Sequence, residues 1–173
     1  MDTTLVLTVI GPDRPGLVDA LSNVIVGHAG SWQKGRMTRL AGQFAGILEV
    51  AVARERVDSM VAALRALDGH GLRVDAQPTQ PDHAGEPPPV TIIEIVGHDR
   101  TGIVAAISKT LAQHDVNVIE LNSQVVQAPW SGEKMFEARI EVHAPASVSF
   151  DEIRVSLEAL AGDLMVDLSI QGS

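Results

Sequence analysis

The chain has 173 residues and a net charge of −9, which argues against direct nucleic-acid binding because phosphate contacts need a basic surface. Hydrophobic residues make up 45% of the chain, so it should fold, yet no apolar run approaches the roughly 20 residues of a membrane helix. The absence of cysteine excludes disulfides and thiol catalysis. Since no secretory leader follows Met1, we expect a cytoplasmic protein without a membrane contact.

The first half begins with strand periodicity, because Leu5, Leu7 and Val9 alternate with their neighbours. A helix follows, with apolar residues on one face and His28 at its end. Two strands are expected at about 31–40 and 43–53, joined by a tight Ala41-Gly42 turn. A second helix and a last strand at 72–76 complete the half. The helix faces consist of Leu17, Leu21, Val24 and His28, and of Val57, Met60, Val61, Leu64 and Leu67.

The second half repeats the first. Residues 11–18 read GPDRPGLV, and residues 97–104 read GHDRTGIV, an offset of 86 residues. A spacing this long indicates a duplicated domain, since solenoid repeats are roughly 20–50 residues. The expected elements are a strand over 91–95, a helix, two strands at about 118–128 and 134–143, a helix and a strand over 164–170. The helices carry Ile103, Ile107, Leu111 and His114, and Ile153, Leu157 and Leu160 after a Ser149–Glu152 capping box.

A proline-rich segment separates the halves. Residues 78–89 hold five of the nine prolines, which excludes helix and central strand and predicts a linker. The predicted domains are therefore 1–77 and 90–173. The order βαββαβ predicts an α+β protein with two ferredoxin-like domains, each with a four-stranded antiparallel sheet and two helices. Because each unit has only about 80 residues, pairing of sheets within or between chains is expected, and with it a homo-oligomer.

The turn between the first strand and first helix of each half is the candidate binding site. Asp13 and Asp99 are expected N-caps, and Pro15 suits the first helical turn. A helix N-terminus offers N–H groups to a carboxylate, and the aspartate offers an acceptor to an ammonium group. Together these groups match an amino acid. The alternative is that each aspartate only caps its helix.

Glycines flank this turn in both halves. Gly11 and Gly97 are expected to adopt backbone angles closed to other residues. Gly16 and Gly102 are expected to let a ligand approach the helix start. The alternative is that these glycines only make the turn.

These motifs, followed by His28-Ala29-Gly30-Ser31 and by residues 114–118 (HDVNV), resemble the ACT domain, the amino-acid-sensing module of many metabolic enzymes. The resemblance implies that Asp13 or Asp99 contacts a ligand together with the residue that starts the next strand. Asn117 matches that second position, whereas Ser31 replaces it in the first copy. The candidate ligand-binding residues are Gly11, Asp13, Arg14, Gly16, Ser31, Gly97, His98, Asp99, Arg100, Thr101, Gly102 and Asn117.

A free-standing tandem pair is similar to accessory transcriptional regulators of the glycine cleavage type. The resemblance implies a regulator that responds to glycine or a similar small amino acid and acts through a protein partner such as a transcription activator. The alternative is a ligand-independent interaction or assembly module with vestigial loops. No nucleophile–base pair and no metal-ligand spacing is evident, so we expect neither an enzyme nor a cofactor.

Overall fold

The computed structural model describes residues 2–79, 89–145 and 148–172. The chain divides into two compact units, Met1–Gly85 and Glu86–Ser173. The first contains β1 (Asp2–Pro12), α1 (Leu17–Gly27), β2 (Ser31–Leu40), β3 (Gln43–Ala53), η1 (Arg54–Arg56), α2 (Val57–Ala66), η2 (Leu67–His70) and β4 (Arg73–Thr79). The second contains β5 (Thr91–His98), α3 (Ile103–Gln113), β6 (Asn117–Gln127), β7 (Lys134–His143), α4 (Phe150–Leu164) and β8 (Val166–Gly172).

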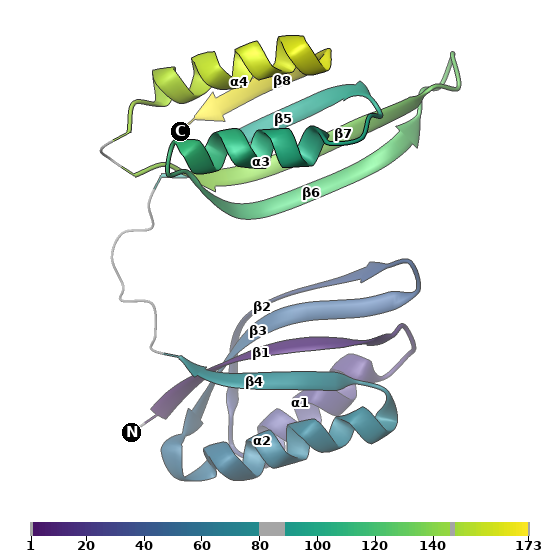
Figure 1. The fold of residues 1–173 in the computed structure, drawn as a ribbon. Helices are drawn as coiled ribbons and strands as arrows, with labels where there is room; N and C mark the ends of the chain where they lie inside the picture. The colour runs from purple at the N-terminus through teal and green to yellow at the C-terminus, as the bar shows by residue number, and fades with distance from the viewer. Residues whose placement is uncertain (1, 80–88, 146–147, 173) are drawn as a thin grey trace. The chain divides into compact units, whose positions relative to one another are not determined.

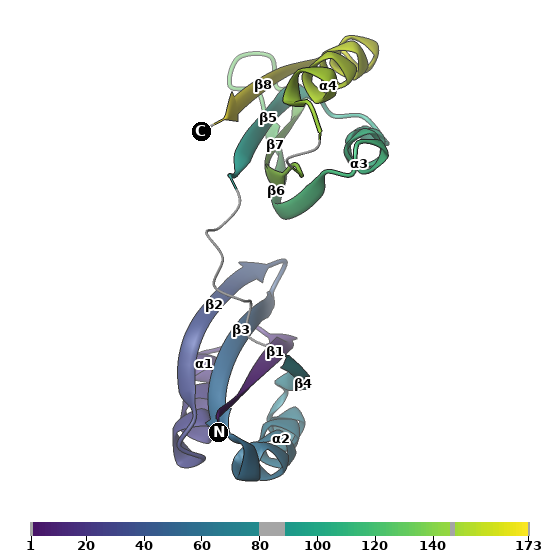
Figure 2. The same cartoon turned by 90° about the vertical axis from the view of Figure 1, so that its left-hand side faces the viewer.

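Each unit is one four-stranded antiparallel sheet with two α-helices on a single face (Figures 1 and 2). The strand orders are β2-β3-β1-β4 and β6-β7-β5-β8, so the two central strands of each sheet are not consecutive in the chain. The predicted α+β class and the ferredoxin-like βαββαβ arrangement are confirmed. Among the described residues, no helix is long and apolar enough to cross a membrane.

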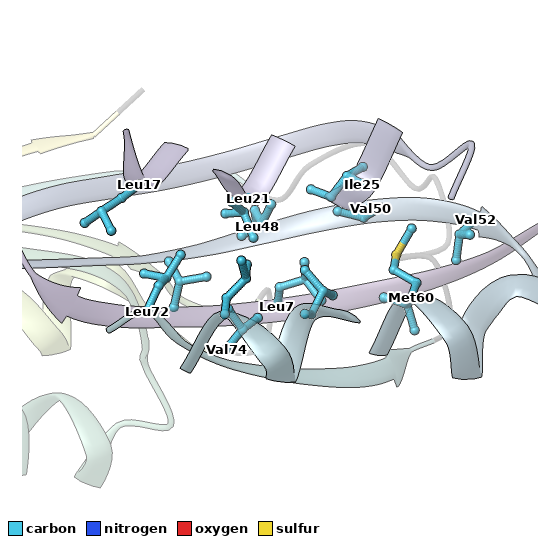
Figure 3. Packing of buried hydrophobic residues seen from close by; sticks show 14 residues of the cluster. Leu7, Leu17, Leu21, Ile25, Leu48, Val50, Val52, Met60, Leu72 and Val74 are labelled. Atoms are coloured by element: carbon cyan, nitrogen blue, oxygen red, sulfur yellow. The ribbon is translucent and has the colours of Figure 1, made fainter. Parts of the chain in front are cut away.

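One hydrophobic core lies between sheet and helices in each unit. Alternate residues of β1 point at the helices, and Leu5 and Leu7 are fully buried. Leu21 of α1 and Met60 of α2 belong to the helices that cover the sheet, pack in the same core and are also fully buried (Figure 3). The opposite face of the sheet stays open, where Ile47 is 50% exposed. The period-2 pattern of the strands therefore predicts the core face correctly.

The two hairpins differ in their connections. Ala41 and Gly42 both have positive φ, 49° and 76°, as the predicted two-residue turn requires. The strands on either side match the predicted ranges 31–40 and 43–53. In the second unit six residues, Ala128–Glu133, join β6 to β7. The second unit therefore has a longer hairpin arm than the first.

The helix starts differ from the prediction. Gly16 and Gly102 are the N-cap residues of α1 and α3, with φ of 91° and 96°, and no side chain caps either helix. Asp13 and Asp99 are thus not N-caps, and Pro15 precedes the first turn. The chain reverses direction at a left-handed glycine immediately before each helix, which leaves the aspartates outside the capping position. Ser149 is the N-cap of α4 by position, but it makes no side-chain capping bond.

Strand β4 runs into the predicted linker. It was expected to end at residue 76, but Leu5 pairs with Pro78 and Thr4 with Thr79. Proline is tolerated there because β4 is an edge strand, with one side free of ladder bonds. Most of the predicted linker, residues 80–88, lies outside the described residues. The boundaries 1–77, 78–89 and 90–173 otherwise stay a prediction.

Candidate functional site

The strand–helix turn of each unit lies beside the adjacent hairpin. In the first unit, the Asp13 backbone N–H donates to the Gly42 carbonyl across 2.9 Å. In the second unit, the Asp99 N–H donates to the Lys134 carbonyl at the same distance. Each candidate aspartate is thereby held at the end of the sheet where the neighbouring hairpin turns.

Gly11 and Gly97 are required by close packing. Neither has a positive φ, so the expected special backbone angles are wrong. A Cβ on Gly11 would lie 2.3 Å from the Gly71 carbonyl oxygen, and one on Gly97 would lie 2.5 Å from Val166 Cγ1. The first strand of each unit therefore passes against the start of the last strand without room for a side chain.

Gly16 and Gly102 are required by conformation. A Cβ on either would meet nothing within 4 Å, but φ near +90° disfavours any other residue. The helical ladder begins with Ala20 N–H to Gly16 O, and with Ala106 N–H to Gly102 O. The backbone N–H groups that precede these donors have no acceptor within the helix and are available at its start.

The two aspartates have different electrostatic surroundings. The Asp13 carboxylate pairs with Arg39 Nε at 2.6 Å. In the second unit the equivalent position is Val125, because Arg39 and Val125 each pair with the phenylalanine of the next strand, Phe44 or Phe136. Across the described ranges, no lysine, arginine or histidine pairs with the Asp99 carboxylate. Asp13 is therefore engaged, whereas Asp99 can accept a cation from a ligand.

An open depression of about 500 Å³ adjoins the Asp99 turn. Its apolar wall comes from the first turn of α3 and from the facing pair Val125 and Phe136, and its polar end from Asp99 and Arg100. The lining residues are Asp99, Arg100, Gly102, Ile103, Val104, Ala105, Val125 and Phe136. Because Val125 stands where the first unit has Arg39, the same exchange that frees Asp99 also makes this wall apolar.

The first unit has a smaller cavity on another side of its turn. It has a volume of about 240 Å³ and lies between the start of α1 and the η2 segment. Arg14 lines it, but Asp13 does not. The lining residues are Arg14, Pro15, Gly16, Leu17, Ala20, Leu67, His70 and Leu72. The duplicated motif therefore produces two different sites.

Three further candidates lie around the second turn. Arg100 Nη2 is 3.8 Å from the Met165 sulfur. His98 Nδ1 lies 4.0 Å from Glu133 Oε2, on the hairpin side of the turn, and does not line the depression. Thr101 is exposed and does not line it either. Of these three, only Arg100 is placed to contact a molecule in the depression.

Ser31 and Asn117 lie at the opposite end of their sheets. Asn117 pairs with His143, the last residue of β7, whereas Asp99 bonds to Lys134, the first. The ten residues of β7 separate them by roughly 30 Å at 3.3 Å per residue (Figure 1). Asp99 and Asn117 of one unit are therefore too far apart to contact the same small ligand. A ligand role for Asn117 or Ser31 stays a prediction, and only for a site that two units share.

The sequence comparisons agree with this architecture. Models of the ACT domain match residues 3–77 and 91–146, and the chain belongs to the ACT domain family, with two such domains in tandem. The resemblance noted from the glycine and aspartate motifs is thus confirmed. In the part of the chain that the structure describes, no group of three or more His, Cys, Asp or Glu residues is arranged to hold a metal ion.

Similar proteins include a regulator and proteins without a functional name. The chain is 23% identical over a 176-residue alignment to the glycine cleavage system transcriptional repressor of Escherichia coli K12, covering 98% of this chain and 87% of that one. A UPF0237 protein of Methanococcus maripaludis is 31% identical over 81 residues, which is 46% of this chain and 83% of the relative. A crystal structure of an unknown protein from Galdieria sulphuraria superposes with a TM-score of 0.84 at 24% identity, covering 100% and 99% of the two chains.

Proposed function

We propose that this protein is a non-enzymatic regulator whose second ACT domain binds a small amino acid at the β5–α3 turn. The observation that carries the proposal is the Asp99 carboxylate, which has no cationic partner in the described ranges and lies at an open depression beside the start of α3. In the first unit, the equivalent carboxylate, that of Asp13, already forms an ion pair with Arg39.

In this proposal, each charged group of the amino acid has a partner of opposite charge at the turn. The ligand's ammonium faces the Asp99 carboxylate, which accepts a charge-assisted hydrogen bond. Its carboxylate faces the N–H groups of the first turn of α3, where the helix dipole is positive. Arg100 lines the same depression and adds a second positive charge for that carboxylate. A short side chain then contacts the apolar wall.

The similarity to the E. coli repressor supports a role in controlling amino-acid breakdown. Because the net charge is −9, we propose that the protein acts through a protein partner such as a transcription activator, without contacting DNA itself. Glycine or a comparably small amino acid is the proposed signal. The proposal includes a cytoplasmic location, where such a partner would be found.

The ion pair in the first unit favours a second role for that domain. With Asp13 held by Arg39, its turn has no free carboxylate for an ammonium group. We therefore assign the first domain to ligand-independent assembly or partner contact. A single ligand per chain is the expected stoichiometry.

A thermal-shift screen of the twenty amino acids, followed by calorimetry, tests the proposal. A ligand present at 100 times its Kd adds about 2.7 kcal/mol to the free energy of unfolding, enough to raise Tm measurably. Asp99→Asn should weaken binding of the selected amino acid by about 10- to 100-fold, since it removes a charged hydrogen-bond acceptor. Asp13→Asn is the matched control and should bind as the wild type does. Equal loss in both variants, or no stabilising amino acid, would count against the proposal.

A further inference from the structure

Helix α4 ends on a methionine with a left-handed backbone. Met165 is the C-cap residue of this helix, with φ of 53° and ψ of 51°. The first unit has Gly71 at the equivalent place, with φ of 74°. The two places correspond because each lies two residues before the strand residue that pairs with Ile10 or with Val96, which the repeat aligns. Glycine adopts this conformation freely, whereas a side chain disfavours it, so the backbone alone does not favour a methionine there.

The arginine of the strand–helix turn reaches this place in both units. A Cβ built on Gly71 would lie 3.8 Å from Arg14 Nη2. In the second unit, Nη2 of the equivalent Arg100 lies 3.8 Å from the Met165 sulfur. The methionine therefore occupies the space that is open beside Arg14, and it contacts the arginine that lines the depression at the β5–α3 turn. Because a thioether sulfur is only a weak acceptor, the Arg100 guanidinium keeps its capacity to bind a carboxylate.

The sulfur of this methionine is accessible from solution. Met165 is 60% exposed, whereas Met60 is fully buried and both Met37 and Met135 are half-buried. Of the methionines that the structure describes, Met165 is therefore the one that an oxidant in solution reaches most readily. Met165 does not line the depression, so a change at its sulfur acts on the amino-acid site only through Arg100.

We propose that Met165 is an oxidation site through which hydrogen peroxide lowers the affinity of the second unit for its amino acid, an inference that rests on the proposed function above. The sulfur lone pair attacks one peroxide oxygen, the O–O bond breaks as the S–O bond forms, and water leaves. The sulfoxide oxygen accepts a charge-assisted hydrogen bond from Arg100, which then no longer serves the ligand's carboxylate. Methionine sulfoxide reductases remove this oxygen, so the change is reversible.

Calorimetry on the full chain before and after mild peroxide treatment tests the effect on binding. The probe is glycine, or the amino acid that the thermal-shift screen selects in its place. Treated wild type should bind it about 10-fold more weakly, which corresponds to one charge-assisted hydrogen bond, and a sulfoxide reductase should restore the affinity. Met165→Leu keeps the bulk without the sulfur and should bind as the untreated wild type does, before and after peroxide. Met165→Gln carries a permanent acceptor and should bind about 10-fold more weakly without peroxide.

Two measurements without amino acid separate this inference from the amino-acid site. Mass spectrometry of the folded chain should find Met165 oxidised faster than Met60 and Met135. NMR of the arginine guanidinium groups should show that peroxide shifts the Arg100 signal in the wild type but not in Met165→Leu. Slower oxidation of Met165, an unshifted Arg100 signal, or unchanged affinity after oxidation would overturn the inference. Failure of the untreated wild type to bind any amino acid would overturn the proposed function instead, and the two ligand-free results would still decide whether Met165 is an oxidation site that acts on Arg100.

Discussion

Arg39 and Val125 stand at equivalent places in the two units, 86 residues apart and each opposite a phenylalanine of the neighbouring strand. Because the second unit has Val125 in place of Arg39, Asp99 lacks the ion pair that Asp13 makes. The duplicated sequence contains this signal, because the same 86-residue offset that aligns Asp13 with Asp99 aligns Arg39 with Val125. Recognising its consequence required the strand register, which brings Arg39 to a carboxylate 26 positions earlier in the chain.

Replacing the glycines of the turns with alanine should lower the stability of the first unit by different amounts. Gly11→Ala should destabilise the first unit by about 1–3 kcal/mol, because its Cβ would meet a backbone carbonyl at 2.3 Å that cannot move aside. Gly16→Ala should cost about 1–2 kcal/mol through its positive φ alone, since no atom lies near its Cβ. Urea denaturation followed by circular dichroism measures both. Wild-type stability in either variant would contradict the corresponding explanation.

Helix α1 shows how far sequence patterns predict an element. The apolar spacing correctly predicts its buried face, including Leu17 and Leu21, and its C-cap residue His28. Its start is missed because aspartate and proline are favoured at helix N-termini, whereas the tertiary turn selects a left-handed glycine, Gly16. Local preference was overridden by the need to reverse the chain between strand and helix.

Two residues of this helix form a matched test of the core. Leu21 is fully buried among the residues of the first core, and Val26 on the same helix is 71% exposed. Leu21→Ala should lower the free energy of unfolding by about 2–5 kcal/mol, through lost transfer energy and a residual cavity. Val26→Ala should change it by less than about 0.5 kcal/mol. Equal effects in chemical denaturation would show that α1 does not pack as described.

The sheet also explains why Asn117 and Asp99 of one unit lie far apart. Asp99 and Asn117 are only 18 positions apart in the sequence, but α3 carries the chain back along the sheet between them. Asn117 consequently starts β6 at the far end from Asp99. Sequence proximity and spatial proximity diverge here because a helix of 11 residues intervenes.

At the level of the whole molecule, the repeat, the fold of both units and the tandem ACT assignment follow from the sequence. The functional asymmetry between the units does not, since it arises from contacts that only the folded register creates. The charge of −9 leads to one further expectation, that the isolated protein binds no DNA tightly at physiological salt. A gel-shift titration tests this, and saturable, sequence-specific retardation at nanomolar protein would contradict action through a partner.

The most direct test of the account transplants the ion pair of the first unit into the second. Val125→Arg places a guanidinium at the position from which Arg39 reaches Asp13, so it should neutralise Asp99 and fill the apolar wall of the depression. Arg39→Val is the matched exchange in the first unit and should leave the existing site unaffected. In a calorimetric titration with the amino acid selected by the thermal-shift screen, the wild type should bind one ligand per chain and folded Val125→Arg should bind none. Wild-type affinity in Val125→Arg would contradict the account.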